Sequence, residues 1–272
     1  MVAKINQVPA TQRRIVQAIA IMLPAALLLT GAAALRHKFE RHAAGDSIPG
    51  FPRLVLWAWE RPEDLRFLDP GIWGVAILAK TITVHGSRID ARPRLQPVRL
   101  PAGIPTLAVV RIETDPPLEN PAPALRDSIT HHLLDACGSG AHGLQIDFDA
   151  RLSERSFYRD LLAHVRRKMP KDKKLSITAL ASWCIWDDWI RDLPVDEAVP
   201  MLFRMGRDRE EVCRYLGTGG DFRPVICRSS IGVSTDEPST PAPAGRRIYL
   251  FSPDPWSKDA VARALRETKE LR

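Results

Sequence analysis

The chain has 272 residues, of which 26% are charged and 45% hydrophobic, enough for one large folded domain or two small ones. The net charge is +7, but residues 1–36 hold four basic side chains and no Asp or Glu, which leaves 35 basic against 32 acidic residues in the remainder. This balance argues against a nucleic-acid-binding protein, because that class needs a concentrated basic face.

An apolar stretch at residues 15–35 follows the pair Arg13 and Arg14. It is long enough to cross a bilayer, and Ala32 to Ala34 offer a signal-peptidase site, so we expect an uncleaved anchor or a cleaved signal peptide. A buried helix of the domain is the alternative. The remainder would then lie outside the cytoplasm, in the periplasm, held at the inner membrane or secreted. The expected parts are a cytoplasmic tail (1–12), the leader (13–36), a linker (37–51) and a folded domain (52–272).

Eight apolar runs of β-type composition follow the linker, and most are separated by stretches of helical pattern. Strand alternating with helix predicts a parallel sheet covered on its outside, and eight such units predict a closed (β/α)8 TIM-type barrel. The stretch 85–105 holds four prolines and predicts an irregular excursion. The expected strands are 52–60, 74–82, 106–114, 143–150, 175–183, 197–205, 224–234 and 246–253, and the expected helices are 62–69, 123–137, 153–169, 186–193, 209–217 and 257–272.

A doubly wound open sheet is the rival fold. Neither a G-x-G-x-x-G after the first strand nor a GxxxxGK[ST] loop occurs in the sequence, so the nucleotide-binding signatures typical of such sheets are missing. The four cysteines show no zinc-binding spacing, and we expect them to be buried apolar side chains, although an oxidising compartment would permit a disulfide.

The fourth run, GLQIDFDA at 143–150, carries acids where a buried strand normally carries Val or Ile. Side chains alternate along a strand, so Gln145, Asp147 and Asp149 share one face and the apolar residues share the other. In a barrel the acidic face looks inward, toward the carboxyl ends of the strands where barrel active sites lie.

Polar and aromatic residues gather at the ends of the other expected strands as well. Acids, guanidinium groups and indoles together are typical of a carbohydrate cleft, because sugar rings stack on indoles and polar groups bind their hydroxyls. The expected substrate-binding residues are Trp59, Lys80, Arg111, Gln145, Trp183, Arg204, Asp236 and Trp256.

Cleavage of a glycosidic bond needs a protonated carboxylic acid and a second group at the anomeric carbon. Asp149 is the expected acid and Asp147 its partner, because two neighbouring carboxylates push one pKa upward. Glu60 and Glu113 are reserve candidates for the second carboxylate. In the alternative reading Asp147 is a structural ion-pair partner and Asp149 caps the following helix.

The run LQIDFD resembles the strand-four signature of chitinase-like glycoside hydrolases. In that family acids alternate with apolar residues, and the last acid, a glutamate, donates the proton. The resemblance implies that Asp149 stands at the donor position, with Gln145 and Asp147 at the two preceding acidic positions. The run MLFRM at 201–205 is a weaker resemblance to the same family, in which Met201 and Phe203 match the family's Met and aromatic positions.

Residues 53–256 also resemble a bacterial family catalogued only as a domain of unknown function. The stretches that carry this likeness are LWAWERPEDL, LQIDFDARLSERSFYRDLL, LSITALASWC and SSIGVSTDEP. It implies a fold without a reaction.

The function expected from these features is binding and hydrolysis of a polysaccharide or glycan outside the cytoplasm, with no cofactor. One alternative is a catalytically inactive glycan-binding or scaffolding envelope protein. Another is a metal-assisted hydrolase that uses Asp147, Asp149 and Glu113 around Mg²⁺ or Ca²⁺. The membrane is the other expected partner, through residues 15–35.

Overall fold

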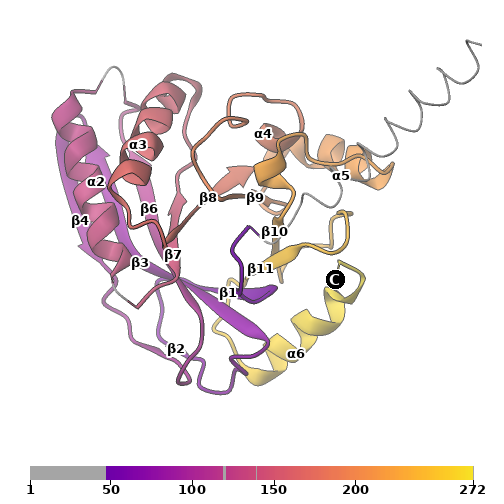
Figure 1. Ribbon diagram of the computed structural model, residues 1–272. Coiled ribbons are helices and arrows are strands. Elements are labelled where there is room, and N and C mark those ends of the chain that lie inside the picture. The colour runs from indigo at the N-terminus through magenta and orange to yellow at the C-terminus, as the bar shows by residue number, and fades with distance from the viewer. Residues whose placement is uncertain (1–46, 119–120, 139, 272) are drawn as a thin grey trace, which may run out of the picture. The chain divides into compact units, whose positions relative to one another are not determined.

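Eight parallel strands close into a barrel in the computed structural model, which describes residues 47–118, 121–138 and 140–271 (Figure 1). The ring closes because β1 pairs with both β3 and β11. The strands in ring order are β1 (Leu54–Ala58), β3 (Trp73–His85), β6 (Thr106–Thr114), β7 (Gly143–Asp147), β8 (Lys174–Leu180), β9 (Glu197–Met201), β10 (Ser230–Ser234) and β11 (Arg247–Phe251). Each overlaps one of the eight expected runs, so the predicted α/β barrel is confirmed.

Helices cover the barrel where the 3.6-residue pattern predicted most of them. They are α2 (Pro123–Cys137), α3 (Arg155–Lys168), α4 (Ala181–Ile185), α5 (Arg209–Gly217) and α6 (Lys258–Glu267). Helix α3 shows why these segments are helical. Tyr158, Leu162 and Val165 form a buried apolar stripe, and Lys168 lies in a basic last turn that complements the helix dipole. Helix α6 begins at Ser257, whose hydroxyl accepts a hydrogen bond from the Ala260 amide.

Two expected helices are wrong. Residues 62–69 form strand β2 (Glu63–Asp64) and turns instead, with β2 paired to β5 (Val98–Arg99). Residues 186–193 are turns, because the helix after β8 is α4 and ends at Ile185. The excursion at 85–105 is irregular as predicted, and it includes β4 (Arg88–Pro93), which pairs with β3 in antiparallel fashion.

The leader predicted at 13–36, the tail before it and most of the linker lie outside the described residues. Within the described ranges, no helix has both the length and the apolar character needed to cross a membrane.

Residues 47–51, expected as part of the linker, pack into the amino-terminal end of the barrel. Ile48 and Phe51 are 2% and 3% exposed and join the barrel's inner apolar cluster. Gly74 leaves room for the Phe51 ring, since a Cβ there would lie 2.9 Å from it. This end of the barrel is therefore filled, and we call residues 47–52 the lower plug.

A buried ion pair fixes the lower plug. Arg247 is 2.9 Å from Glu197, and its guanidinium also donates to the backbone carbonyls of Ile48, Phe51 and Pro52. Glu197 accepts further hydrogen bonds from the hydroxyls of Ser47, Ser176 and Tyr249. A buried charge of this kind persists only when it is paired and fully hydrogen-bonded.

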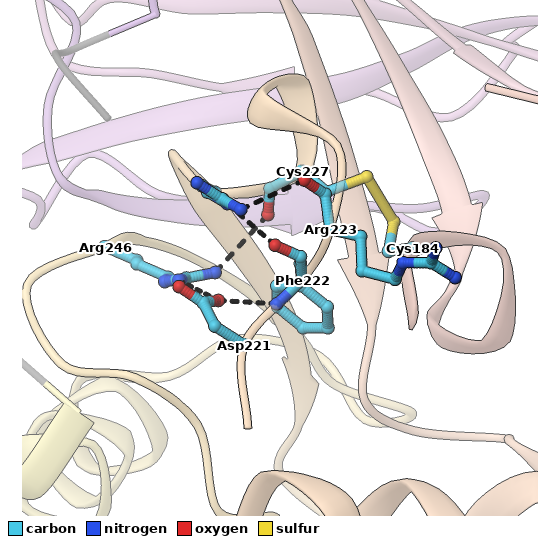
Figure 2. Close-up of a disulfide and its surroundings, with 7 residues drawn as sticks. Cys184, Asp221, Phe222, Arg223, Cys227 and Arg246 are labelled. Atoms are coloured by element: carbon cyan, nitrogen blue, oxygen red, sulfur yellow. Dashed lines mark hydrogen bonds and ion pairs between the residues drawn. A yellow bond between two sulfur atoms is a disulfide. The ribbon is translucent and has the colours of Figure 1, made fainter. Parts of the chain in front are cut away.

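Cys184 and Cys227 are buried as expected and form a disulfide, the alternative that the sequence left open, with Cα atoms 6.0 Å apart (Figure 2). Among the described residues the free thiols are those of Cys137 and Cys213. The bridge joins α4 to the short 3-10 turn η3 (Val225–Cys227) just before β10. It therefore ties the loop after β8 to the loop before β10.

Replacing both Cys184 and Cys227 by Ala is expected to lower the free energy of unfolding by about 3–4 kcal/mol, because the bridge closes a 43-residue separation in the unfolded chain. Urea titration of the oxidised protein and of the variant measures the difference. The matched control is Cys213→Ala, which removes a half-buried free thiol. A double variant as stable as this control would contradict the prediction.

Candidate active site

A cleft of about 340 Å³ opens where the barrel strands end in Asp147, Leu180 and Met201. Its lining comes from β1, β6, β7, β8, β9 and β11 and from the loops that follow β7, β8 and β9. One wall is polar and the other aromatic. In parallel barrels the loops at this end carry the functional residues.

The polar wall holds the two predicted acids. Asp147 is the last residue of β7, its side chain is 13% exposed, and it accepts a 2.7 Å hydrogen bond from the Thr178 hydroxyl. Arg111 lies 3.7 Å from its other oxygen. Asp149 follows two residues later at the more exposed mouth of the cleft. The strand alternation that predicted a shared inward face thus brings both carboxylates into one cavity.

The surroundings shift the pKa of both acids in the same direction. Burial raises the pKa of Asp147, and the nearby charge of Asp149 adds to the rise, whereas the Thr178 hydrogen bond and Arg111 oppose it. Burial also raises the pKa of Asp149, against the opposing charge of Arg111. Asp149 keeps one side in water, yet the cleft walls remove enough solvent to raise its pKa.

The aromatic wall faces these acids from β1 and from the ends of β9 and β11. Phe203 and Phe251 stack with centroids 5.5 Å apart, and Trp59 meets Phe251 edge-on at 6.3 Å. Trp57 forms the floor, where Gly232 leaves space for its ring, since a Cβ at that glycine would lie 2.9 Å from the indole. Flat apolar rings opposite a polar wall suit a sugar, whose two ring faces are apolar and whose rim is polar.

Two arginines lie at the cleft. The Arg111 guanidinium is 6.0 Å from the Trp59 ring centroid and 2.7 Å from Glu113. Burial alone would lower the pKa of Arg111, but Asp147 and Glu113 outweigh it, so its pKa lies above the ordinary value. Arg204 has a φ of 54° and is held by ion pairs to Asp236 and Glu237. Such a backbone conformation in a non-glycine residue is concentrated at functional sites.

Five of the predicted site residues therefore line one cleft: Trp59, Arg111, Asp147, Asp149 and Arg204. Three others lie elsewhere. Glu60 is exposed and pairs with Arg92 of β4, and Glu113 pairs with Arg111 on an exposed face. Lys80 lies on the outer side of the barrel, where it pairs with Asp135 of α2 at 2.7 Å.

The remaining four predicted residues lie beneath or beside the cleft. Gln145 is fully buried below Asp147, where it accepts a 2.7 Å hydrogen bond from the Trp57 indole and donates to Ser176. Trp183 belongs to α4 and packs against Trp189. Trp256 is buried and donates to the Trp57 carbonyl. Asp236 forms an ion pair with Arg204 but does not itself line the cleft. These four support the cleft walls without lining them.

Several lining residues were not predicted as site residues. Thr178 and Phe251 lie on inward-facing positions of β8 and β11, so strand alternation carried the signal for them. Ser182 belongs to α4, where an expected strand hid it. Trp57 lies inside the first expected strand, and it forms the floor.

The donors named for a metal site do not gather into one. Among the described residues, no three His, Cys, Asp or Glu side chains come together in a way that holds a metal ion. Glu113 in particular is engaged by Arg111. Glu113 therefore does not join Asp147 and Asp149 as a third acidic ligand.

The comparison with protein families bears on the polar wall. Residues 102–191 match the family described as a domain of unknown function, DUF3142. The predicted likeness to a family catalogued in this way is confirmed. The DUF3142 segment contains Arg111, Asp147, Asp149, Thr178 and Ser182, which together form the polar side of the cleft.

The other comparisons add one structural neighbour. No curated protein matches the chain. A solved structure, titled as the crystal structure of the Bacillus cereus spore cortex-lytic enzyme SleL, is similar at 13% identity with a TM-score of 0.43. The match covers 81% of this chain and spans 59% of the SleL chain.

Proposed function

We propose that this protein binds a polysaccharide or glycan in the cleft and hydrolyses it by carboxylate acid/base catalysis. The observation that carries the proposal is the pair Asp147 and Asp149 in one cavity, both with raised pKa, opposite a wall of aromatic rings. A raised carboxyl pKa keeps an acid protonated closer to neutrality, which a proton donor to a leaving oxygen requires.

In this mechanism Asp149 transfers its proton to the glycosidic oxygen as the bond from that oxygen to the anomeric carbon breaks. The Thr178 hydroxyl and Arg111 favour the ionised form of Asp147, which stabilises positive charge developing at the anomeric carbon. Water supplies the oxygen that joins the anomeric carbon, and its proton returns to Asp149. One glycosidic bond and one water molecule are consumed, and two hydroxyl ends are formed.

The principal alternative is a glycan-binding protein without turnover. Aromatic rings and arginines alone suffice for binding, but a paired carboxylate in a partly dry cleft is costly unless it serves chemistry. We favour hydrolysis for this reason.

The direct test incubates the purified full chain with insoluble chitin, cellulose and peptidoglycan and measures newly formed reducing ends. Release of reducing ends from one of the three, undiminished by a chelator, is the expected result. Binding without product from any of them would favour the inactive alternative, whereas activity that disappears with chelator and returns with Mg²⁺ or Ca²⁺ would favour metal-assisted hydrolysis.

The pH dependence of hydrolysis gives a second test. Because Asp149 must be protonated, kcat/KM is expected to fall as pH rises through its raised pKa. Arg111 holds that pKa down, so Arg111→Met is expected to move the alkaline limb of the pH profile to higher pH. An alkaline limb that stays in place or moves to lower pH in the variant would contradict the assignment.

We also propose that the protein acts outside the cytoplasm. The Cys184–Cys227 disulfide supports this location, since disulfides persist in oxidising compartments and are rare in the cytosol. The apolar sequence at 15–35 supports it independently.

A further inference from the structure

Three tryptophans follow β8 closely in the sequence, and one of them differs from the other two. Trp183 and Trp189 pack edge to face with centroids 4.9 Å apart, and Arg155 lies over both rings. Trp186 is 40% exposed, whereas Trp183 is only 4% exposed.

Tyr215 of α5 lies beside Trp186, and its ring is fixed in place. The two ring centroids are 6.4 Å apart, and the Tyr215 hydroxyl donates a 2.9 Å hydrogen bond to the Asp221 carbonyl. A Cβ at Gly220 would lie 2.6 Å from the Tyr215 ring, so glycine is required for the ring to rest there. We call Trp186 and Tyr215 the aromatic platform.

The disulfide and its surroundings, which Figure 2 shows, hold the backbone near the platform. Cys184 precedes Trp186 by two residues, and its carbonyl accepts a hydrogen bond from the Arg223 amide. Arg246 binds Asp221 and the Cys227 carbonyl and lies 5.1 Å from the Phe222 ring centroid. A surface held in this way loses little conformational freedom when a ligand binds.

Hydrogen-bonding groups border the aromatic platform. Asp188 lies two residues after Trp186, and its carboxylate pairs with Arg191 at 2.6 Å and with Arg223 at 3.8 Å. All three side chains are exposed. An indole bordered by a carboxylate and guanidinium groups can bind the apolar face of a sugar and its hydroxyls at once.

The aromatic platform begins close to the cleft along the chain, at the end of α4. The Trp186 amide donates a 2.9 Å hydrogen bond to the carbonyl of Ser182, which lines the cleft. The platform thus lies one helical turn from the polar wall. At about 340 Å³ the cleft is near the lower end of ligand pockets, so a polymer bound there must extend beyond it.

From these contacts we infer that the aromatic platform is a distal subsite that binds the glycan chain where it leaves the cleft. The inference rests on the proposed function for its ligand class. In this subsite Trp186 contacts the sugar, and Tyr215 supports the Trp186 ring.

The test measures binding in an Asp149→Asn background, so that the polymer is not consumed. Retention of the protein on insoluble chitin, cellulose and peptidoglycan is compared with and without Trp186→Ala. On each polymer that retains the Asp149→Asn protein, the variant with Trp186→Ala is expected to bind about threefold to tenfold more weakly. Trp186→Phe keeps a ring and should restore most of the binding. The control, Ile72→Ala, removes an apolar side chain that is 49% exposed beside the amino-terminal end of β3, and should change nothing.

If thermal unfolding shows both proteins to be folded, equal retention with and without Trp186→Ala overturns the inference. Failure of the Asp149→Asn protein to bind any of the three polymers also overturns it. A Trp186→Ala protein that does not fold is replaced by Trp186→Leu, which keeps an apolar side chain but no flat ring, and the same fall in binding is then required. Failure of the proposed function would look different, because wild-type protein would bind polymer with a Trp186-dependent affinity and release no product.

Discussion

Replacing Asp149 by Asn is expected to lower kcat for glycan hydrolysis by about 10²–10⁴-fold while the affinity for polymer is retained. Asn has nearly the shape of Asp but has no proton to donate to the leaving oxygen. The measurement is reducing-end release at saturating substrate, together with a binding isotherm. Glu113→Gln is the matched control, because Glu113 is an acid near Arg111 that does not line the cleft. Turnover that survives Asp149→Asn would discard Asp149 as the acid.

Asp147→Asn should also lose turnover, and it should raise stability at neutral pH. A carboxyl whose pKa is raised by folding contributes stability that is fully present below its unfolded pKa and is lost as pH rises through the raised value. At pH 7 the ionised Asp147 therefore costs stability, and an uncharged amide removes the cost. A melting temperature above that of the wild type at pH 7, with the difference shrinking toward pH 4, is the expected signature. A lower melting temperature at pH 7 would show that Asp147 is a structural ion-pair partner.

Arg247→Met is expected to destabilise the barrel by about 3–5 kcal/mol. The substitution leaves the Glu197 charge buried without its ion-pair partner and removes the donor to the carbonyls of the lower plug. Urea unfolding followed by tryptophan fluorescence measures the loss.

Two further variants separate the ion pair from simple loss of an arginine. Adding Glu197→Gln to Arg247→Met should recover part of the stability, because no uncompensated charge then remains in the core. Arg214→Met removes an arginine from an exposed pair with Glu210 and should leave the free energy of unfolding nearly unchanged. If Arg247→Met were as mild as Arg214→Met, the lower plug would not depend on this pair.

The fold followed from the sequence because each barrel strand is a short apolar run bordered by turn residues. The acids were found for a related reason, since strict alternation in β7 places Gln145 and Asp147 on the inner face. Alternation does not predict how far along the barrel each inward-facing residue lies. Gln145 and Asp147 share a face, but only Asp147 is near enough to the strand end to reach the cleft.

Lys80 shows where alternation fails. Ala76 and Leu78 of β3 face the barrel interior, so Lys80 should follow them inward. The register between β3 and β6 shifts between Leu78 and Lys80, and this bulge turns the later residues to the outside, where Lys80 meets Asp135. A bulge changes no residue type, and the sequence therefore gave no sign of it.

The loop after β8 escaped prediction for a different reason. The run LSITALASW reads as one strand, but the chain turns into α4 at Ala181. Trp183 therefore lies on a helix and packs under the rim, while Ser182 enters the cleft. Apolar composition does not distinguish a buried strand from a short buried helix. The disulfide was equally hidden, because Cys184 and Cys227 are 43 residues apart in the sequence and come together only once β8, β9 and β10 lie side by side.

The lower plug determines which end of the barrel can be attached to a surface without blocking the cleft. Ser47 meets Glu197 and Arg247 at the filled end of the barrel, whereas Asp149 opens at the other. Immobilising the protein on a sensor surface through a tag placed before Ser47 should leave the cleft accessible to a bulky, insoluble polymer. Coupling through the loops beside Arg204 or Trp186 should obstruct it, which makes the attachment point part of the design of every binding assay described above.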